Sequence, residues 1–434
     1  MTKFLVHGLR AASALALVGA ASPSLAGGFL INEQSTTATG RALSGAAVAA
    51  DGPGAIFFNP AIMTELEGIQ LEAGGQILLA KAEQIDRGST RTIPGLPVTA
   101  PVGGNGGGNP FPQPLLVPNA SASVQVSDRV WLGVSVNGPF GLISDYDEGF
   151  FGRYDADRSK LFTLNVQPSA AVKLSDNVSI GAGLDVQYAD VELTNALPNL
   201  APGSPDGLLD VQGDDISFGW NAGATVTFAP VRFGVHYRSQ IKHDLEGTLE
   251  ISGLGGPLAA NNRTDDASAP LDLPDIATVS MQIGIDTPYR FYATWRHYGW
   301  SSFEEVRVQP ATGPALVDEQ DYRDTWSMAL GADYDVSDKL TVRAGTMFDQ
   351  TPVTDEHRGF RIPDGDRTWL SAGASYDLGH FTANLSYAHV WVASASVDVT
   401  ETVYAGSPAA IDIRRLARST GSVNILAASI ASRF

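Results

Sequence analysis

Basic side chains at alternating positions are the residues of this sequence best suited to chemistry. In the stretch 231–238, VRFGVHYR, the apolar Phe233, Val235 and Tyr237 share one parity and the basic residues share the other. Successive side chains of a strand point to opposite faces, so these cations lie on a polar face that backs an apolar one. The same alternation, extrapolated in the case of Arg323, adds further candidates. The full set is Arg232, His236, Arg238, Arg296, Arg323 and Arg343.

These cations could bind an anionic ligand. The planar guanidinium group of arginine donates paired hydrogen bonds to a carboxylate, which suits it to a fatty acid head group. Aspartate and glutamate occupy the same polar face, however. A structural ion pair is therefore the alternative role for each of these arginines.

Enzymatic chemistry has little support in the sequence. There is no Gly-x-Ser-x-Gly elbow and no His-Glu-x-x-His motif, and the seven histidines are scattered. Cysteine is absent, which excludes disulfides and thiolate metal sites. The acidic run 145–148 lacks the loop glycines of a calcium site, so a solvated loop is favoured there. We expect no enzymatic activity, no metal and no cofactor.

The candidate cations lie on segments that alternate with a period of two. The clearest is 216–228, in which Ile216, Phe218 and Trp220 begin an apolar face and small polar residues form the other. A soluble sandwich could alternate in this way. Most of the segments, however, reach the roughly 9 to 11 residues that a tilted strand needs to cross a bilayer.

Fourteen such segments can be distinguished, and short turns alternate with long connections between them. This arrangement is typical of outer-membrane barrels, and an aromatic C-terminal residue, Phe434, fits a final strand that closes the barrel. We therefore predict an all-β protein, a fourteen-stranded antiparallel transmembrane β-barrel. The segments are 68–81, 116–127, 129–138, 160–175, 177–194, 214–229, 231–249, 274–287, 289–308, 321–336, 338–350, 365–379, 381–399 and 421–434.

The residues before the barrel divide into two parts. Residues 1–26 have a basic start, a short apolar core and small residues before position 27, as in a secretory signal peptide. Its removal would leave 26 basic and 47 acidic residues, a net charge of −21. Such an acidic chain is not expected to bind nucleic acid. Residues 27–67 are small and nearly uncharged, and we expect them to plug the barrel formed by residues 68–434.

This plug is called the hatch below. A mobile N-terminal tail is the alternative for the same segment. Few of its residues could form a charged outer face, so it requires cover on most sides. The residues that we expect to define the hatch are Phe29, Ile31, Asn59, Pro60 and Ala61.

Short motifs in a fixed order resemble the family of long-chain fatty acid transporters (FadL) and toluene and xylene uptake proteins. Each motif is weak alone, but together they span nearly all of the chain after residue 26. They are Gly28–Gln34, Gly40–Ala42, Asn59–Ala61, Gly138–Leu142, Tyr237–Ser239, Trp300–Phe303, Phe348–Val353 and Ile362–Arg367.

The resemblance implies a monomeric barrel that captures hydrophobic molecules between its third and fourth outer loops. In this chain those loops would be 195–213 and 250–273, whose leucines supply apolar surface, although a solvated loop is the alternative. The expected groove residues are Leu197, Leu200, Leu208, Leu209, Leu254 and Leu258.

The resemblance also implies a pocket behind the hatch and lateral release into the bilayer at a kink in the third strand. That kink would lie at Asn137, Gly138, Pro139, Phe140 and Gly141, because proline and glycine weaken strand pairing. Alternatively, the strand simply ends there.

The sequence thus predicts an outer-membrane channel for diffusion of hydrophobic molecules, with long-chain fatty acids first and aromatic hydrocarbons as the alternative. Outer-membrane lipid and lipopolysaccharide would surround it. A phospholipase or a general porin is less favoured, because a lipase would need a serine–histidine pair and a porin an open lumen.

Overall fold

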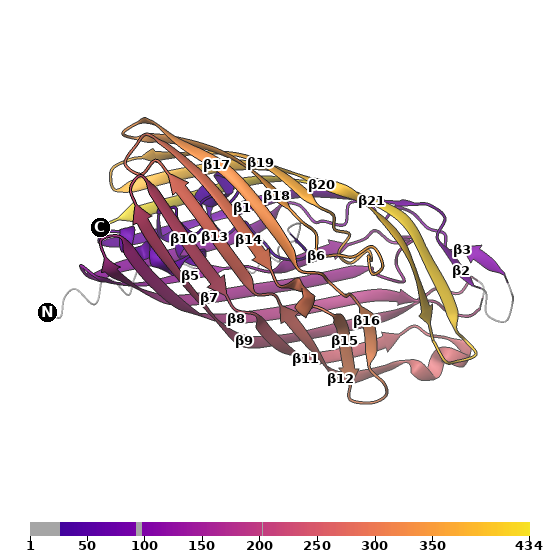
Figure 1. Cartoon of the computed structure of the whole chain (residues 1–434). Coiled ribbons are helices and arrows are strands. Elements are labelled where there is room, and N and C mark those ends of the chain that lie inside the picture. The colour runs from indigo at the N-terminus through magenta and orange to yellow at the C-terminus, as the bar shows by residue number, and fades with distance from the viewer. Residues whose placement is uncertain (1–26, 93–97, 202) are drawn as a thin grey trace.

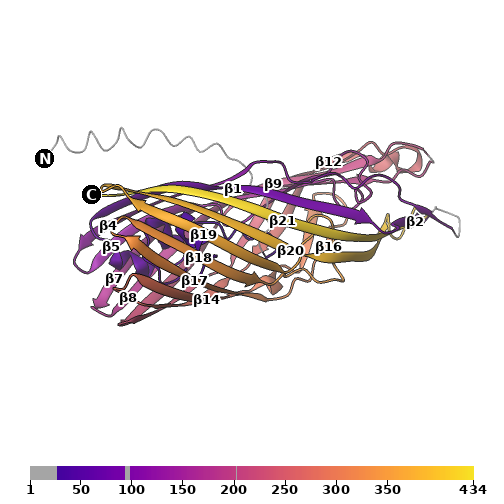
Figure 2. The ribbon, with the colours of Figure 1, turned by 90° about the horizontal axis from the view of Figure 1, so that it is seen from above.

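The chain folds into a long barrel of tilted strands, seen from two directions in Figures 1 and 2. This computed structural model describes residues 27–92, 98–201 and 203–434, so the predicted signal peptide lies outside the described residues. No helix in those ranges is both long and apolar enough to cross a membrane.

The described strands form one closed antiparallel sheet of fourteen barrel strands. The first strand pairs with the last, from Gln70 opposite Arg433 to Asp86 opposite Ala417, which closes the barrel. The predicted fold class is confirmed. Nine barrel strands are continuous: β1 (Ile69–Asp86), β4 (Leu115–Ser127), β7 (Arg158–Ser175), β8 (Val178–Leu197), β9 (Gly207–Phe228), β18 (Leu340–Asp349), β19 (Arg367–Asp377), β20 (Phe381–Val403) and β21 (Ile411–Arg433).

The other five barrel strands are each broken into an inner and an outer piece. A separate outer hairpin consists of β2 (Thr90–Thr92) and β3 (Thr99–Pro101). The broken strands, inner piece first, are β5 (Val130–Asn137) with β6 (Gly141–Asp145), β10 (Val231–Arg238) with β11 (Ile241–Ser252), β13 (Ile276–Ile283) with β12 (Arg263–Leu273), β14 (Tyr289–Tyr298) with β15 (Glu305–Pro310), and β17 (Thr325–Ser337) with β16 (Leu316–Glu319).

The outer surface carries the apolar residues that alternation predicts. On β9, Ile216, Phe218 and Trp220 are exposed, Phe218 to 71% of its surface, where a soluble sheet would bury them. Exposed tryptophans recur on other strands, as Trp295 on β14 and Trp326 on β17. An apolar band with an aromatic girdle is the surface that a barrel presents to lipid.

The hatch consists of short helical turns. They are α2 (Thr36–Gly40), η2 (Pro53–Phe57) and η3 (Pro60–Glu65), and nearly all of their side chains are buried. The backbone lies directly against the barrel wall: a Cβ on Gly345 would come within 2.1 Å of the carbonyl oxygen of Arg41. Glycine is required there because no larger residue leaves room for the approach.

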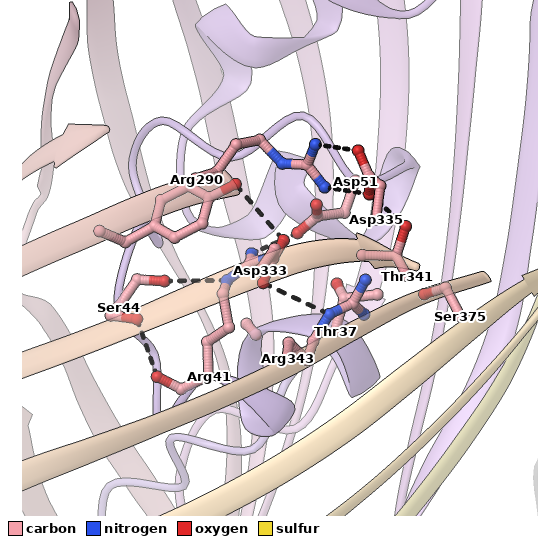
Figure 3. Close-up of polar contacts among 12 residues, drawn as sticks. Thr37, Arg41, Ser44, Asp51, Arg290, Asp333, Asp335, Thr341, Arg343 and Ser375 are labelled. Atoms are coloured by element: carbon pink, nitrogen blue, oxygen red, sulfur yellow. Dashed lines mark hydrogen bonds and ion pairs between the residues drawn. The ribbon is translucent and has the colours of Figure 1, made fainter. Parts of the chain in front are cut away.

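Arg41 fixes the hatch to the wall through charge (Figure 3). Its Nη1 donates to Asp333 Oδ2 of β17 at 2.8 Å, its Nη2 pairs with Asp51, and its guanidinium lies 4.6 Å from the ring centre of Tyr292. Arg343 of β18 approaches the other oxygen of Asp333 at 3.7 Å. Buried charges are tolerated only when they are paired in this way.

Candidate functional site

A large apolar cavity lies in the outer half of the barrel. It spans about 850 Å³ of space, part of it open to solvent, and is lined by β6 to β9, β11, β12 and β15, with Phe29 of the hatch. Inward-facing aliphatic residues such as Leu161, Val191, Leu245 and Leu271 form its walls. A cavity with such an apolar lining suits an aliphatic or aromatic ligand.

Phe29 is the hatch residue that contacts the cavity. Its ring lies edge-on to Trp300, with centroids 4.7 Å apart, and to Phe303 and Phe140 at 5.2 and 6.2 Å. Trp300 stands in the short turn η5 (Trp300–Ser302), where β14 and β15 separate. Edge-to-face contacts of this kind add to the burial energy of the rings, so Phe29 is held by both the strand break and η5.

Arg361 is the one charged residue among those lining the cavity in the described chain. Its Nη1 donates to Ser159 Oγ at 3.2 Å and to the Thr194 carbonyl at 3.4 Å, and its Nη2 donates to Asn195 Oδ1 at 3.1 Å. These acceptors are all neutral, and no carboxylate within the described ranges forms an ion pair with it. A carboxylate ligand would therefore find a guanidinium that has no ion-pair partner in the described residues and that borders an apolar cavity.

A second, polar cavity adjoins the first one through Gln320, Arg361 and Ile362. It contains Asp318 of β16, which lies beyond the apolar band. Burial, reinforced by the nearby carboxylate of Asp155, raises the pKa of Asp318 to about 6 despite Arg361. Asp155 is itself paired with Arg415 at 2.7 Å.

The third barrel strand is broken where the sequence predicted a kink. β5 ends at Asn137 and β6 begins at Gly141, and in the described residues β4 pairs with β5 but not with β6. The hatch occupies this edge: Ile31 N donates to Pro139 O at 2.8 Å, and Gly141 N donates to Phe29 O at 2.9 Å. The break is therefore capped by hatch backbone.

The other expected hatch residues hold its far end in place. Asn59 caps η3 by accepting from Ala61 N at 3.0 Å, and its amide donates to the Ala47 carbonyl at 2.8 Å. Pro60 opens η3, where its missing N–H costs no hydrogen bond. These residues are buried and do not line the apolar cavity.

Five of the six basic candidates face the lumen, but they contact the hatch or the wall. Arg238 pairs with Asp185 and donates to Phe57 O at 2.8 Å, and Arg296 donates to Asn32 Oδ1 at 2.8 Å. Arg232 pairs with Glu65 at 2.8 Å, whereas His236 is buried beside these arginines. With Arg343 beside Asp333, three of these arginines have the structural ion pairs that were the alternative role, whereas Arg296 bonds a neutral amide and His236 Nε2 has no hydrogen-bond partner in the described residues.

The inward orientation predicted for Arg323 is wrong. The residue precedes β17, which begins at Thr325, so strand parity does not extend to it. Its side chain is exposed and donates to the Thr351 carbonyl at 3.2 Å.

The predicted bounds of the two outer loops are also wrong. β8 continues to Leu197 and β9 begins at Gly207, so both strands extend into the first predicted loop. β11 and β12 leave only residues 253–262 between them. Strands that extend beyond the bilayer have lost the apolar outer face, so their residues resemble a loop in sequence. Of the predicted groove leucines, Leu208 is exposed, and Leu254 and Leu258 are buried. None of the six lines the apolar cavity; Leu197, Leu200 and Leu209 are half-buried.

Sequence reasoning missed Arg361. It stands immediately before the motif Ile362–Arg367 and on no predicted strand, so parity could not orient it. The aliphatic walls could have been found, because Val191, Leu193 and Val211 fall on the inward parity of strands that continue outward.

Comparison with known proteins relates the chain to outer-membrane transporters. A family model described as outer membrane protein transport protein (OMPP1/FadL/TodX) matches residues 17–434. A 47 kDa outer membrane protein of Pasteurella multocida is 31% identical over 86% of this chain and 88% of its own. The long-chain fatty acid transport protein of Escherichia coli K12 is 27% identical over 91% and 94%.

Solved structures share the architecture. The crystal structure of a Pseudomonas aeruginosa FadL homologue superposes with a TM-score of 0.82 at 25% identity, covering 94% of this chain and all of that one. The Ralstonia pickettii toluene transporter TbuX, at 19% identity, covers 92% and 97% with a TM-score of 0.65 and shows the fold alone. The chain therefore belongs to the outer membrane protein transport family that includes FadL and TodX.

Proposed function

We propose that this outer-membrane protein is a diffusion channel for hydrophobic molecules, and that its main cargo is long-chain fatty acids. The observation that carries the proposal is the apolar cavity with a single charged lining residue, Arg361. The acyl chain would occupy the aliphatic chamber and the carboxylate would bind the guanidinium. The name of the Escherichia coli relative supports the same cargo.

The path through the barrel follows from the position of Phe29. This residue contacts both the cavity and Phe140 at the strand break, so a small shift of the hatch would connect the two. The break lies in the wall that faces lipid, and lateral release there would avoid the polar hatch anchors below. Capture by the outer loops, a monomeric state and surrounding lipopolysaccharide stay predictions. No catalytic step is proposed, and uptake would be driven by consumption of the cargo inside the cell.

Binding to the purified protein in a non-ionic detergent tests the cargo. Oleate, its methyl ester and toluene would be compared on the wild type and on Arg361→Gln. We expect the substitution to weaken oleate binding about tenfold, because a charge-assisted hydrogen-bonded pair contributes roughly 1.5–3 kcal/mol. Binding of the methyl ester should be unchanged.

Arg323→Gln is the matched control, since Arg323 is exposed and lies outside the cavity. Equal loss of oleate and methyl ester, or an equal effect of the control, would contradict the head-group role of Arg361. If toluene binds and oleate does not, the protein would still be a channel for hydrophobic molecules, but its cargo would be aromatic hydrocarbons. Binding of none of the three would reject a hydrophobic-ligand site.

A further inference from the structure

Two strands of the outer wall, β12 and β15, are joined along only part of their length. Their inner pair is Ser268 opposite Gln309, next to the pair formed by Ala267. No ladder pair follows in the described chain until β13 and β14 begin to pair, where Gly299 N donates to Asp275 O at 3.0 Å. The unpaired interval is called the window below, and its two edges are residues 269–274 and 300–308.

The window has a physical cause in the sequence. Pro270 and Pro274 lack the N–H group that a continuous ladder uses. On the opposite edge, Trp300–Ser302 forms the turn η5 in place of a strand. The two edges therefore differ in length and cannot pair in register.

The apolar cavity extends to both edges of the window. Residues 269–271 line it from β12, and Phe303, Val306 and Val308 line it from the opposite edge. Successive side chains of a strand point to opposite faces, so a cavity lined by three consecutive residues reaches around the edge of β12. The window is therefore an apolar interruption of the wall that borders the cavity.

One edge of the window belongs to a hairpin that few backbone contacts hold. β15 and β16 pair with each other, and β15 pairs with β12 only on the outer side of the window. Ala311 N donates to Asp266 O at 2.8 Å near the tip, and Gln320 N donates to Glu304 O at 2.8 Å near the base. Because no ladder crosses the interval between them, this edge can move outward without breaking strand pairs.

The window lies at the end of the apolar outer surface. The exposed large apolar residues of β13 and β14 end at Val279 and Trp295, on the inner side of the window. Beside the window, the strands carry the ion pairs of Asp272 with Lys242 at 3.1 Å and of Arg307 with Glu305. An apolar surface followed by charged residues marks the boundary between lipid and the polar layer.

We propose that the window is the entrance to the cavity, through which hydrophobic molecules pass sideways from the outer boundary of the membrane. Such molecules concentrate at lipid surfaces because water excludes them, so an opening there meets more cargo than one in the aqueous mouth. A molecule that enters beside Phe303 reaches Phe29, whose ring centre lies 5.2 Å from that of Phe303. The inference rests on the proposed function, since it requires a hydrophobic cargo.

A disulfide across the window tests the route. Ala269 and Val308 come directly after the pair of Ser268 and Gln309, so a bond between cysteines at these two positions would extend the ladder into the window. The association of cis-parinaric acid, a fluorescent fatty acid, would be followed by stopped flow in a non-ionic detergent. The oxidised and reduced forms of Ala269→Cys with Val308→Cys differ only in the bond.

We expect oxidation to slow both association and dissociation at least about tenfold, because a narrower entrance raises the barrier in both directions. The affinity at equilibrium should be the same in the two redox forms, since the site itself is unchanged between them. Where the bond does not form, Ala269→Trp narrows the window by bulk and should slow association relative to the wild type. The control is Glu305→Cys with Glu319→Cys, a cross-strand pair within the hairpin that does not line the cavity.

Oxidation of the control should leave both rates unchanged. Equal rates in the two redox forms of the window variant, or an equal effect in the control, would overturn the window as the entrance. A fall in association without a matching fall in dissociation would also overturn it, because the bond would then have altered the site. These results leave the proposed cargo intact, whereas failure of the wild type to bind the fatty acid would contradict the proposed function and this route together.

Discussion

At the scale of single residues, the role of an arginine in this barrel depends on what its guanidinium group contacts. Arg41 and Arg238 meet buried carboxylates and fasten the hatch to the wall. Arg361 meets only neutral oxygens and opens onto an apolar cavity. The first two are needed to offset buried negative charge, whereas the third keeps its charge available for a ligand.

The protonation state of Asp318 should change the affinity of Arg361 for an anionic ligand. Its pKa of about 6 is raised by burial, so it is ionised above pH 6 and neutral below it. The ionised form opposes an anion at Arg361, and the affinity for an anion should therefore rise as pH falls through 6. We expect the affinity for decanesulfonate to rise roughly threefold when the pH falls from 7.5 to 5.5. A change of this size is in the range measured for interactions between partly exposed charges. The sulfonate does not titrate in this interval.

Asp318→Asn is the control for this titration, because the variant should bind decanesulfonate equally well at both pH values. The polar cavity also holds His357, which faces Asp321 at 3.4 Å. A pH dependence that persists in Asp318→Asn would contradict the role of Asp318.

Sequence could orient these residues only where a strand was recognised. Parity placed Arg238 and Arg343 in the lumen, because alternation holds within a pleated strand. It failed for Arg323, which precedes its strand, and was silent on Arg361, which lies between strands. Partners such as Asp185 for Arg238 arise from pairing across the barrel, which one sequence does not reveal.

At the scale of elements, the strand break and the hatch form one unit. The sequence predicted a kink at 137–141, since proline and glycine weaken the ladder there. It could not predict that residues 29–31 would cap the break, because that contact joins segments more than a hundred residues apart. Leu30 and Phe140 face each other in an isolated antiparallel bridge at this junction.

A disulfide across this bridge should close the lateral path. Residues opposed in an antiparallel pair have Cα atoms about 4.5–5.5 Å apart, within the range that a disulfide spans. The chain has no cysteine, so Leu30→Cys with Phe140→Cys introduces a single possible bond. We expect oxidised cells to lose uptake of radiolabelled oleate and a reductant to restore it.

The Leu30→Cys variant alone serves as the control and should be insensitive to the reductant. Binding of oleate to the purified, oxidised double variant should persist, since neither Leu30 nor Phe140 lines the cavity. Full uptake with the disulfide formed would show that the cargo leaves by another route.

At the scale of the whole molecule, the barrel was predictable because lipid and closure constrain it strongly. Apolar residues face outward on every crossing, and every strand must pair on both edges. The outer extensions were less predictable, because β11, β12, β15 and β16 stand beyond the apolar band and lack its alternation of exposed apolar residues. The apolar cavity lies among these extensions, which is why the predicted leucine groove missed it.

We expect the hatch to give the barrel its selectivity and its removal to turn the protein into a pore. Residues of the hatch are buried against polar lumen side chains, as where Gly45 N donates to Thr294 Oγ at 2.8 Å and Ala47 N donates to Ser280 Oγ at 3.1 Å. Deletion of residues 27–66 would expose these groups, with the charges of Asp333 and Arg343, to water. A polar, water-filled lumen conducts ions, whereas the filled one should not.

Single-channel recording in planar bilayers would compare the deletion variant with the full protein. We expect stable conductance steps from the variant only, accompanied by loss of oleate binding because Phe29 is gone. Retention of a compact barrel by the variant can be checked by its mobility before and after heating in detergent. Conductance of the intact protein equal to that of the variant would mean that the hatch does not seal the lumen, and the protein would then act as a general porin.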